Sequence, residues 1–302
     1  MSILITGGTG MVGSAFKRIL PEGEYPSRRE FQDLSFSLPG KDVIHLAAKV
    51  GGVKANTLEM ADFYQENSEI NQKIIHYSYT EGANKLVSLL STCVYPDAID
   101  VRYPLTENQL HSGPPHESNF GYAYAKRMVD VMSRAYRQQF GCNFITAIPN
   151  NLYGENDNFD LENGHVIPAL IRKVWEAKTS NSPSVKCWGD GSPLREFTYS
   201  EDIVHILLFL LENYSGPDPI NIGNTAEYSI RYVVELICKT MDYTGKIEWQ
   251  TSEPMGQHRK PSSNKKLVDL GWKESDYTSI EAGIKKTCDW FTLNYPDVRG
   301  VI

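Results

Sequence analysis

The sequence predicts an α/β fold: a doubly wound parallel sheet joined to a smaller α/β lobe. Through the first half of the chain, short apolar runs alternate with segments that have helical spacing, and this alternation favours parallel strand pairing. The first apolar run leads directly into a glycine-rich segment, residues 7–13, that precedes a helical pattern. Both observations indicate a Rossmann-type nucleotide-binding domain at the start of the chain.

The expected elements of the first half follow from these patterns in order. We expect strands over residues 2–6, 42–48, 85–91 and 144–149, and helices from the glycine-rich segment to residue 20, over 58–81 and over 122–140. Residues 29–41 contain two Ser, a Pro and a Gly but no amphipathic pattern. We therefore expect the crossover helix in this region to be lost or reduced to a turn.

The pattern loosens after residue 154. We expect helices over 165–178 (opened by Pro168), 200–213 (capped by Ser200), 230–241 and 279–295, and strands over 185–188, 219–222 and 246–249. The expected division is an NADP-binding domain over residues 1–154 and a mainly substrate-binding lobe over 155–302. Part of the latter, about 198–224, is expected to pack back on the first domain.

Composition excludes several classes of protein. The chain has 302 residues, a formal net charge of −7 and a pI of about 5.6, which argue against a nucleic-acid or anionic-membrane surface. No apolar run is long enough to span a bilayer, and the N-terminus enters a strand at once, so a signal peptide is not expected. Five cysteines without framework spacing indicate free thiols in a reducing, cytoplasmic setting.

The segment Gly7-Gly8-Thr9-Gly10-Met11-Val12-Gly13 is the predicted pyrophosphate site. Glycines allow a sharp turn and a close approach of the backbone to phosphate, and the following helix N-terminus supplies N–H donors. The alternative is a glycine-rich turn without a ligand, which the strand–turn–helix context disfavours.

The choice of dinucleotide depends on residues 25–29, where an NAD site would place an acidic residue. This chain has Arg28 and Arg29 there, and guanidinium groups suit a 2′-phosphate, so NADPH (NADP+) is the expected cofactor. A solvated basic pair on a loop is the alternative. Asp33 is expected near the adenine, and Leu46, Ala47 and Ala48 are expected to line the nucleotide crevice.

Ser91, Tyr122 and Lys126 form a predicted catalytic set. Tyr122 and Lys126 are four residues apart on a helix, so both side chains face the same way. An ammonium near the phenol would lower the pKa of the tyrosine, which could then pass a proton to or from a carbonyl oxygen that Ser91 also binds. These residue types indicate hydride transfer at a carbonyl.

Motifs that run nearly end to end carry a resemblance to a known family. They are residues 7–13, His45-Leu-Ala-Ala-Lys-Val-Gly-Gly52, Ser91-Thr-Cys-Val-Tyr-Pro96, Gly121-Tyr-Ala-Tyr-Ala-Lys126, Asn151-Leu-Tyr-Gly154, Asp157-Asn-Phe159, His165-Val-Ile-Pro168 and Trp188-Gly-Asp-Gly-Ser-Pro-Leu-Arg-Glu-Phe197. With them the chain resembles the extended short-chain dehydrogenase/reductase family. Within it, the chain is similar to the branch that epimerises GDP-4-keto-6-deoxy-D-mannose at C3 and C5 and reduces it at C4.

The resemblance implies roles for particular residues. Cys93 would be the base and His165 the acid of epimerisation, while Tyr122, supported by Lys126 and Ser91, would stabilise the enolate and later protonate O4. Further cofactor contacts are implied at Leu90, Ser91, Tyr122, Lys126, Pro149, Asn151, Leu152 and His165. Contacts with the GDP-sugar substrate are implied at Asn151, Lys173, Trp188, Arg195 and Lys260.

The chain departs from its relatives at three places. Related dehydratases carry Asp-Glu after the Ser-Thr, whereas Cys93-Val94 here counts against dehydration. Lys173 replaces a common arginine, which keeps the charge but loses the fork. Met255-Gly256 replaces a common Asp-Gly and leaves guanine recognition in that loop open. Arg259 and Lys260 nearby either compensate or form a solvated basic cluster.

Alternatives remain at this point. The chain could act on a dideoxy sugar such as the colitose precursor, could epimerise without reducing, or could be a non-catalytic nucleotide sensor on the same fold. The family resemblance also implies a homodimer packed through residues 58–81 and 122–140. No bound metal is expected.

Overall fold

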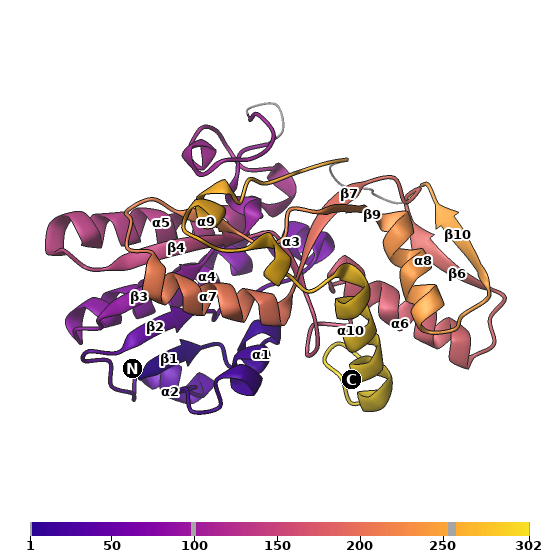
Figure 1. Cartoon of the computed structure of the whole chain (residues 1–302), viewed down its shortest axis with the longest axis horizontal. Coiled ribbons are helices and arrows are strands. Elements are labelled where there is room, and N and C mark those ends of the chain that lie inside the picture. Colours follow the sequence, from indigo (N-terminus) through magenta and orange to yellow (C-terminus); the bar gives the residue numbers. More distant parts are fainter. Residues whose placement is uncertain (1, 98–100, 253–257, 302) are drawn as a thin grey trace.

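The computed structural model describes residues 2–97, 101–252 and 258–301, which form two lobes (Figure 1). The first lobe contains a five-stranded sheet in the order β1-β2-β3-β4-β8, and every neighbouring pair is parallel. The predicted doubly wound parallel sheet is therefore confirmed. Its elements are β1 (Ile3–Thr6), α1 (Met11–Ile19), α2 (Arg28–Asp33), β2 (Asp42–His45), α3 (Val53–Leu58), α4 (Met60–Thr80), β3 (Lys85–Leu89), η1 (Thr92–Val94), η3 (Glu107–Gln109), η4 (Glu117–Asn119), α5 (Phe120–Phe140), β4 (Phe144–Pro149), α7 (Ser200–Asn213) and β8 (Ile220–Ile222).

Both faces of this sheet are buried, because successive strand residues point to opposite sides and helices cover each side. Leu4 and Val43 belong to a cluster with residues of α4 and α5, which pack against each other. Ile5 and Ile44, their neighbours along the strands, belong to a cluster with residues of α1 and α7. The carboxyl ends of the strands are thus held on one edge, where the loops that follow them meet.

β8 and α7, from the second half of the chain, help to complete the first lobe. β8 pairs with β4, with Ala147 opposite Ile220, and α7 packs beside α1. The buried ammonium of Lys85 on β3 donates to the carbonyl oxygens of Leu210 (2.9 Å) and Leu211 (2.7 Å) at the end of α7. Both elements lie within the segment expected to pack back, about 198–224; the boundary at residue 154 stays a prediction.

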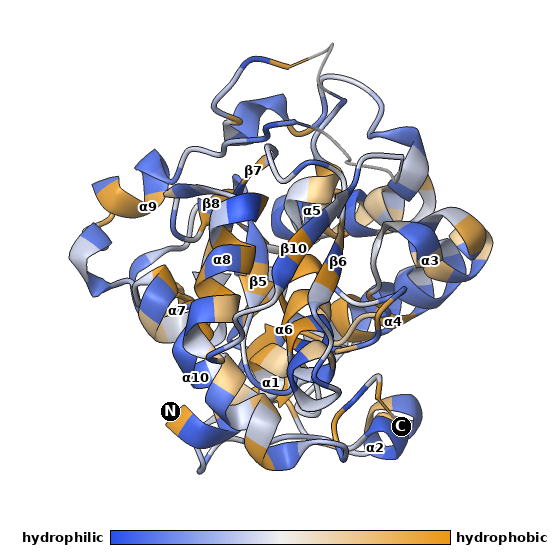
Figure 2. Ribbon diagram, turned by 90° about the vertical axis from the view of Figure 1, so that its right-hand side faces the viewer, coloured by the Kyte–Doolittle hydropathy of each residue, from blue (hydrophilic) through white to orange (hydrophobic). Residues whose placement is uncertain are grey.

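The second lobe is smaller and is built around three helices. Its elements are β5 (Asn151–Tyr153), α6 (Val166–Thr179), β6 (Ser184–Trp188), β7 (Leu194–Tyr199), β9 (Glu227–Ser229), α8 (Ile230–Thr240), β10 (Lys246–Gln250) and α10 (Ile280–Asn294). Between β10 and α10 lie α9 (Lys265–Asp269) and η5 (Glu274–Asp276), and Leu267 of α9 packs in the core of the first lobe. β6 pairs with β10, while β7 lies between β5 and β9. Ile171, Ile237 and Phe291 bring α6, α8 and α10 into one core, and the inner α6 is largely hydrophobic (Figure 2). No helix in the described part of the chain has the length and apolar character needed to span a membrane.

Two expectations about local structure were wrong. Residues 28–33 form a short helix rather than a turn, because Ser27 and Glu30 make a capping box: Ser27 Oγ accepts from Glu30 N (3.2 Å) and Glu30 Oε2 accepts from Ser27 N (2.7 Å). Ser200 is the first residue of α7 and not its cap. The N-cap is Tyr199, and the buried Ser200 hydroxyl has no hydrogen-bond partner among the described residues.

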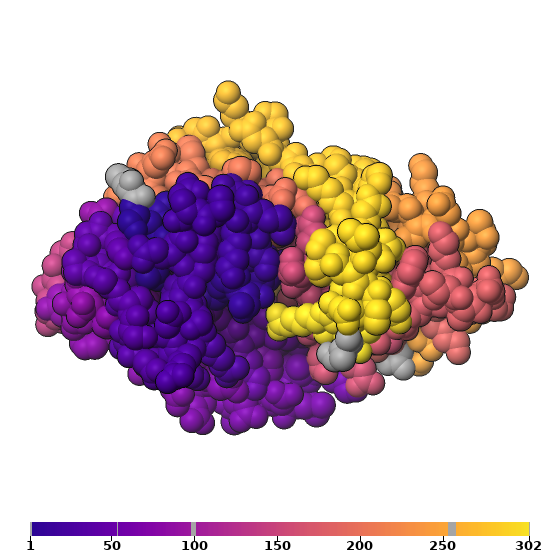
Figure 3. All heavy atoms as spheres, turned by 90° about the horizontal axis from the view of Figure 1, so that it is seen from below, coloured from indigo at the N-terminus to yellow at the C-terminus, as the bar shows by residue number. Residues whose placement is uncertain are grey.

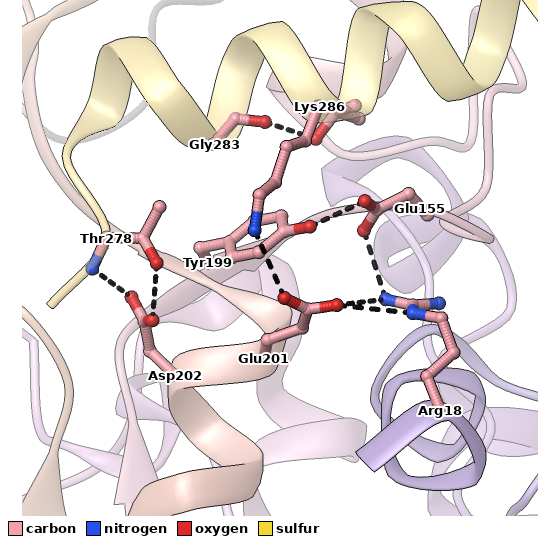
Figure 4. A network of polar contacts seen from close by, with 9 residues as sticks. Arg18, Glu155, Tyr199, Glu201, Asp202, Thr278, Gly283 and Lys286 are labelled. Carbon is pink, nitrogen blue, oxygen red and sulfur yellow. Dashed lines mark hydrogen bonds and ion pairs between the residues drawn. The ribbon is translucent and has the colours of Figure 1, made fainter.

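The lobes meet along the C-terminal helix and its tail, which lie between the N-terminal half and the second lobe (Figure 3). A charged network joins them (Figure 4). Arg18 Nη2 of α1 lies 3.2 Å from both Glu155 Oε2 and Glu201 Oε1, and Lys286 Nζ of α10 lies 3.3 Å from Glu201 Oε2. Tyr199 donates to Glu155 Oε1 at 2.5 Å. Side chains from both lobes therefore share one set of polar contacts.

Candidate active site

A cavity of about 2570 Å³ runs from the carboxyl ends of the first strands to the second lobe. Ligands of open α/β sheets bind at this edge. The cavity brings together candidate residues that are far apart in sequence. Those that line it are Gly7, Gly8, Thr9, Gly10, Met11, Val12, Gly13, Arg28, Leu46, Ala47, Ala48, Leu90, Ser91, Cys93, Tyr122, Lys126, Pro149, Asn151, Leu152, His165, Lys173, Trp188, Arg195 and Lys260.

The turn between β1 and α1 requires glycine at two positions. Gly7 has a φ of +74°, which side-chain-bearing residues rarely adopt. A Cβ on Gly13 would lie 2.2 Å from Gly7 O, so only glycine lets α1 approach the turn this closely. Thr6 Oγ1 accepts from Leu46 N (3.2 Å) and Ala47 N (3.3 Å), which fixes the end of β2 beside the turn. The first turn of α1 carries no acidic residue, so its N–H groups face the cavity without a competing carboxylate.

The two arginines proposed for the 2′-phosphate lie in different places. Arg28, at the start of α2, lines the cavity. Arg29 is 91% exposed and pairs with Asp33, with Nε 3.6 Å from Oδ2. Neither Arg29 nor Asp33 lines the cavity, although Gln32 and Leu34, the neighbours of Asp33, do. The expectation for Asp33 is corrected by the helix: as the last residue of α2, it points back along the helix towards Arg29.

The end of β3 and the first turns of α5 hold the predicted catalytic set together. Ser91 follows β3 and caps η1, and its Oγ accepts from Cys93 N (3.2 Å). The buried Lys126 donates from Nζ to Leu89 O (3.0 Å), and Ser91 is a hydrogen-bond partner of Tyr122. Arg127 Nε donates to Val94 O (2.5 Å), which ties the short helix carrying Cys93 to α5.

The expected lowering of the tyrosine pKa is wrong for this chain without a ligand. Burial raises the pKa of Tyr122, Cys93 raises it further, and the Ser91 hydrogen bond only partly opposes them. Burial also lowers the pKa of Lys126 to about 8. The ammonium lies against the Leu89 carbonyl, and desolvation outweighs its effect on the phenol. Tyr122 is therefore a protonated donor at neutral pH.

His165 also lines the cavity, as the N-cap residue of α6. Its Nδ1 is 3.5 Å from Asp157 Oδ1, and its side chain is 44% exposed. Burial lowers the pKa of His165, but the nearby Asp157 carboxylate more than offsets this, so the pKa of His165 is raised overall. Asp157 was not among the predicted site residues, although the 157–159 motif was a signal for it.

The far end of the cavity is cationic and aromatic. Lys173 Nζ lies 4.9 Å from the centre of the Trp188 ring, which is half-exposed. Arg195 Nη1 donates to Leu194 O (2.7 Å), and burial lowers the pKa of Arg195. Lys260 lies close enough to Cys93 for their charges to interact.

The structure separates Arg259 from Lys260, the two basic residues expected either to bind substrate or to form a solvated cluster. Arg259 pairs with Glu227 on the surface, while Lys260 lines the cavity. Met255-Gly256 lies outside the described residues. Among the described residues, no group of three or more His, Cys, Asp or Glu side chains could hold a metal ion.

Comparison with known proteins places this site in a family. A model described as the NAD dependent epimerase/dehydratase family matches residues 22–223. The chain belongs to this family. It is 38% identical over 315 residues to a GDP-L-fucose synthase of Dictyostelium discoideum, covering 99% of this chain and 97% of that protein.

Two further proteins show how close the similarity is. The structure of a GDP-L-fucose synthetase from Naegleria fowleri bound to NADP matches with a TM-score of 0.91 and 38% identity, covering 99% of this chain and 94% of that one. A GDP-L-colitose synthase of Yersinia pseudotuberculosis is 34% identical over 305 residues, 96% of this chain and 98% of that protein.

Proposed function

We propose that this chain converts GDP-4-keto-6-deoxy-D-mannose to GDP-L-fucose, by epimerisation at C3 and C5 and NADPH-dependent reduction at C4. The observation that carries the proposal is that one cavity holds both Ser91-Tyr122-Lys126 and the separate proton-transfer candidates Cys93 and His165. The first set suits reduction of a carbonyl, and the second suits proton exchange at the carbons beside it. Similarity to GDP-L-fucose synthases over nearly the whole chain supports this assignment.

The cofactor end of the cavity fits NADPH. The glycines of residues 7–13 let the backbone form a tight turn at the cavity wall, and the start of α1 offers N–H donors to a pyrophosphate. The Arg28 guanidinium at the cavity wall is suited to a 2′-phosphate. When bound, NADPH supplies the hydride for C4.

Epimerisation begins because the 4-keto group acidifies the protons on C3 and C5. Cys93 removes a proton from one face, His165 returns one on the other face, and Tyr122 donates a hydrogen bond to the enolate oxygen. The raised pKa of Tyr122 keeps that donor protonated until reduction, when its proton moves to O4. One carbonyl thus serves both reactions.

The far end of the cavity supplies the substrate contacts. The Arg195 guanidinium is suited to bidentate binding of a diphosphate, with Lys173 and Lys260 as further cations. Trp188 offers an aromatic face to the base or sugar, and Asn151 lines the same cavity.

A homodimer through α4 and α5 is part of the proposal. Tyr79 and Phe140 stack at 4.2 Å between ring centres and are 36% and 43% exposed, an apolar surface suited to a second copy. Light scattering tests this interface: Phe140→Glu should give a monomer, whereas Leu293→Glu, on the exposed face of α10, should leave the dimer intact.

A cytoplasmic location is also part of the proposal, and the five free cysteines support it.

A dideoxy substrate of the colitose type is the second candidate, favoured by the similarity to the colitose synthase. A nucleotide sensor is disfavoured, because Ser91, Tyr122 and Lys126 remain assembled as a proton-transfer set.

Product identification tests the proposal. Incubation with GDP-4-keto-6-deoxymannose and NADPH should oxidise the cofactor and give GDP-L-fucose by NMR; no loss of NADPH absorbance rules out the reductase. Faster turnover of the 3-deoxy analogue favours the second candidate. In heavy water without NADPH, deuterium should enter at C3 and C5, and full exchange by Cys93→Ser would show that the base is another group.

A further inference from the structure

The loop from β5 to α6 carries two of the polar side chains in the cavity wall, Asp157 and His165. Asp157 Oδ1 accepts from Asn158 N (2.7 Å), and Asp160 O accepts from Gly164 N (3.0 Å). These bonds hold both ends of the loop in one shape. The position of Asp157 relative to His165 is therefore set by the backbone.

The C-terminal tail braces this loop from outside. Phe159 N donates to Arg299 O (2.9 Å), and Arg172 Nη1 donates to both Phe159 O (3.2 Å) and Gly300 O (2.6 Å). Gly300 has a φ of +87°, and a Cβ there would lie 2.2 Å from Asn158 Oδ1. The tail thus brings Arg299, almost at the end of the chain, to the wall of the same cavity.

The contact between Asp157 and His165 has the form of a positioning pair. The Asp157 side chain is only 7% exposed, and its Oδ2 is buried with no hydrogen-bond partner among the described residues. Its Oδ1 is 3.5 Å from Nδ1 of His165, so a small rotation of the ring makes a direct hydrogen bond. A buried carboxylate with an open oxygen beside an imidazole favours the tautomer or cation that carries a proton on Nδ1.

We propose that Asp157 is the positioning residue of His165: it holds the Nδ1 proton, so that Nε2 exchanges a proton with the substrate carbon, and Arg299 opposes it electrostatically. This inference rests on the proposed function, in which His165 returns a proton to C3 or C5. The proton passes from Nε2 to carbon, and solvent replaces it. A general acid works best with a pKa near the working pH; Asp157 raises the pKa of the imidazole, and Arg299 opposes that rise.

The other charged groups on this wall balance one another. Lys54 of α3 pairs with Glu162 of the loop. Asp160 uses its Oδ1 to accept from Glu162 N (3.0 Å) and Asn163 N (2.6 Å). Asp157 and Arg299 are accordingly the charges that act on His165, with opposite signs.

Titration of the His165 ring by NMR, in substrate-free protein with labelled histidine, tests the pair directly. The signal is assigned by its loss in His165→Gln. In Asp157→Asn, which keeps the acceptor for Asn158 N, the midpoint should fall by about 1 pH unit. In Arg299→Gln it should rise. Asp160→Asn, in the same loop, is the matched control and should leave it unchanged. An unchanged midpoint in Asp157→Asn overturns the proposal.

Deuterium uptake separates positioning from a structural role. Asp157→Asn should lower kcat for exchange at the carbon served by His165 and move its pH profile, with KM unchanged, and Asp157→Glu should restore part of the rate. Loss of both exchange and substrate binding, without a moved profile, would mean a structural role. The titration of His165 needs no substrate, so its result holds even if another sugar proves to be the substrate. It therefore distinguishes failure of the Asp157–His165 proposal from failure of the proposed function.

Discussion

At the scale of single residues, burial decides the protonation of the catalytic set. The sequence places Lys126 beside Tyr122, which suggests a phenolate. The structure instead buries both groups and turns the ammonium to the Leu89 carbonyl. Desolvation then disfavours the charged form of each, and only the fold reveals how much water each side chain loses.

Lys126 should make stability depend on pH in the cofactor-free protein. Its pKa is about 8 when folded and 10.5 as an ordinary lysine, so between these values the unfolded state binds more protons and the free energy of unfolding rises with pH. From pH 8 to 9.5 the gain is about 2 kcal/mol. Urea unfolding of the native chain and of Lys126→Met checks this, since stability should rise less with pH in the variant; parallel pH profiles of the two proteins would contradict the prediction.

Arg28 should decide the choice of cofactor. We expect Arg28→Ala to weaken NADPH binding by about 10- to 100-fold, because a charge-assisted hydrogen bond is lost, and to leave NADH binding unchanged. Arg29→Ala is the matched control, since Arg29 is exposed and pairs with Asp33. Calorimetric titration with both dinucleotides distinguishes the two. Equal losses in the two variants would place the 2′-phosphate elsewhere.

At the scale of elements, short capping signals count as much as long periodic patterns. α2 has only six residues, too few for an amphipathic pattern, yet its capping box fixes it. The three-residue strands β5 and β9 escaped prediction for the same reason: periodicity needs more residues than they have.

The turn between β1 and α1 offers a matched pair of substitutions. Gly13→Ala should lower the free energy of unfolding by about 1–3 kcal/mol, because its Cβ would meet the Gly7 backbone at 2.2 Å. At Gly10 the nearest atom to an added Cβ is Gly7 O at 3.5 Å, so Gly10→Ala should unfold like the native chain. Urea unfolding without cofactor measures both. Equal stability of the two variants would argue against close packing of α1 on the turn.

At the scale of the whole molecule, ion pairs join the two lobes in addition to the polypeptide chain that runs between them. Arg18 connects α1 to Glu155 and Glu201, and Glu201 connects to Lys286 on α10 (Figure 4). The helix that follows the glycine turn is thereby tied to α10, a core helix of the second lobe.

Removal of Arg18 should loosen this junction. Arg18→Met leaves the largely buried Glu155 with Tyr199 as its remaining polar contact, and we expect a loss of about 1–2 kcal/mol in the free energy of unfolding. Lys285→Met removes an exposed pair with Asp289 on the same α10 and should cost less than about 0.5 kcal/mol. Chemical denaturation compares them. A loss in Arg18→Met no larger than in the control would mean that the network adds nothing to the junction.

The sequence alone determined the parallel sheet, the glycine turn and most of the long helices, because each depends on contacts between near neighbours or on a local period. Nearly all of the site residues that it named line the cavity, and many of them follow strand ends that a parallel sheet brings to one edge. Only the tertiary structure decided which arginine faces the cavity, how burial sets the pKa values of Tyr122 and Lys126, and that Asp157 lies beside His165 in the cavity that Arg299 also lines. Those features depend on distances between segments remote in the chain and on how much water the fold removes, and neither is written in local sequence.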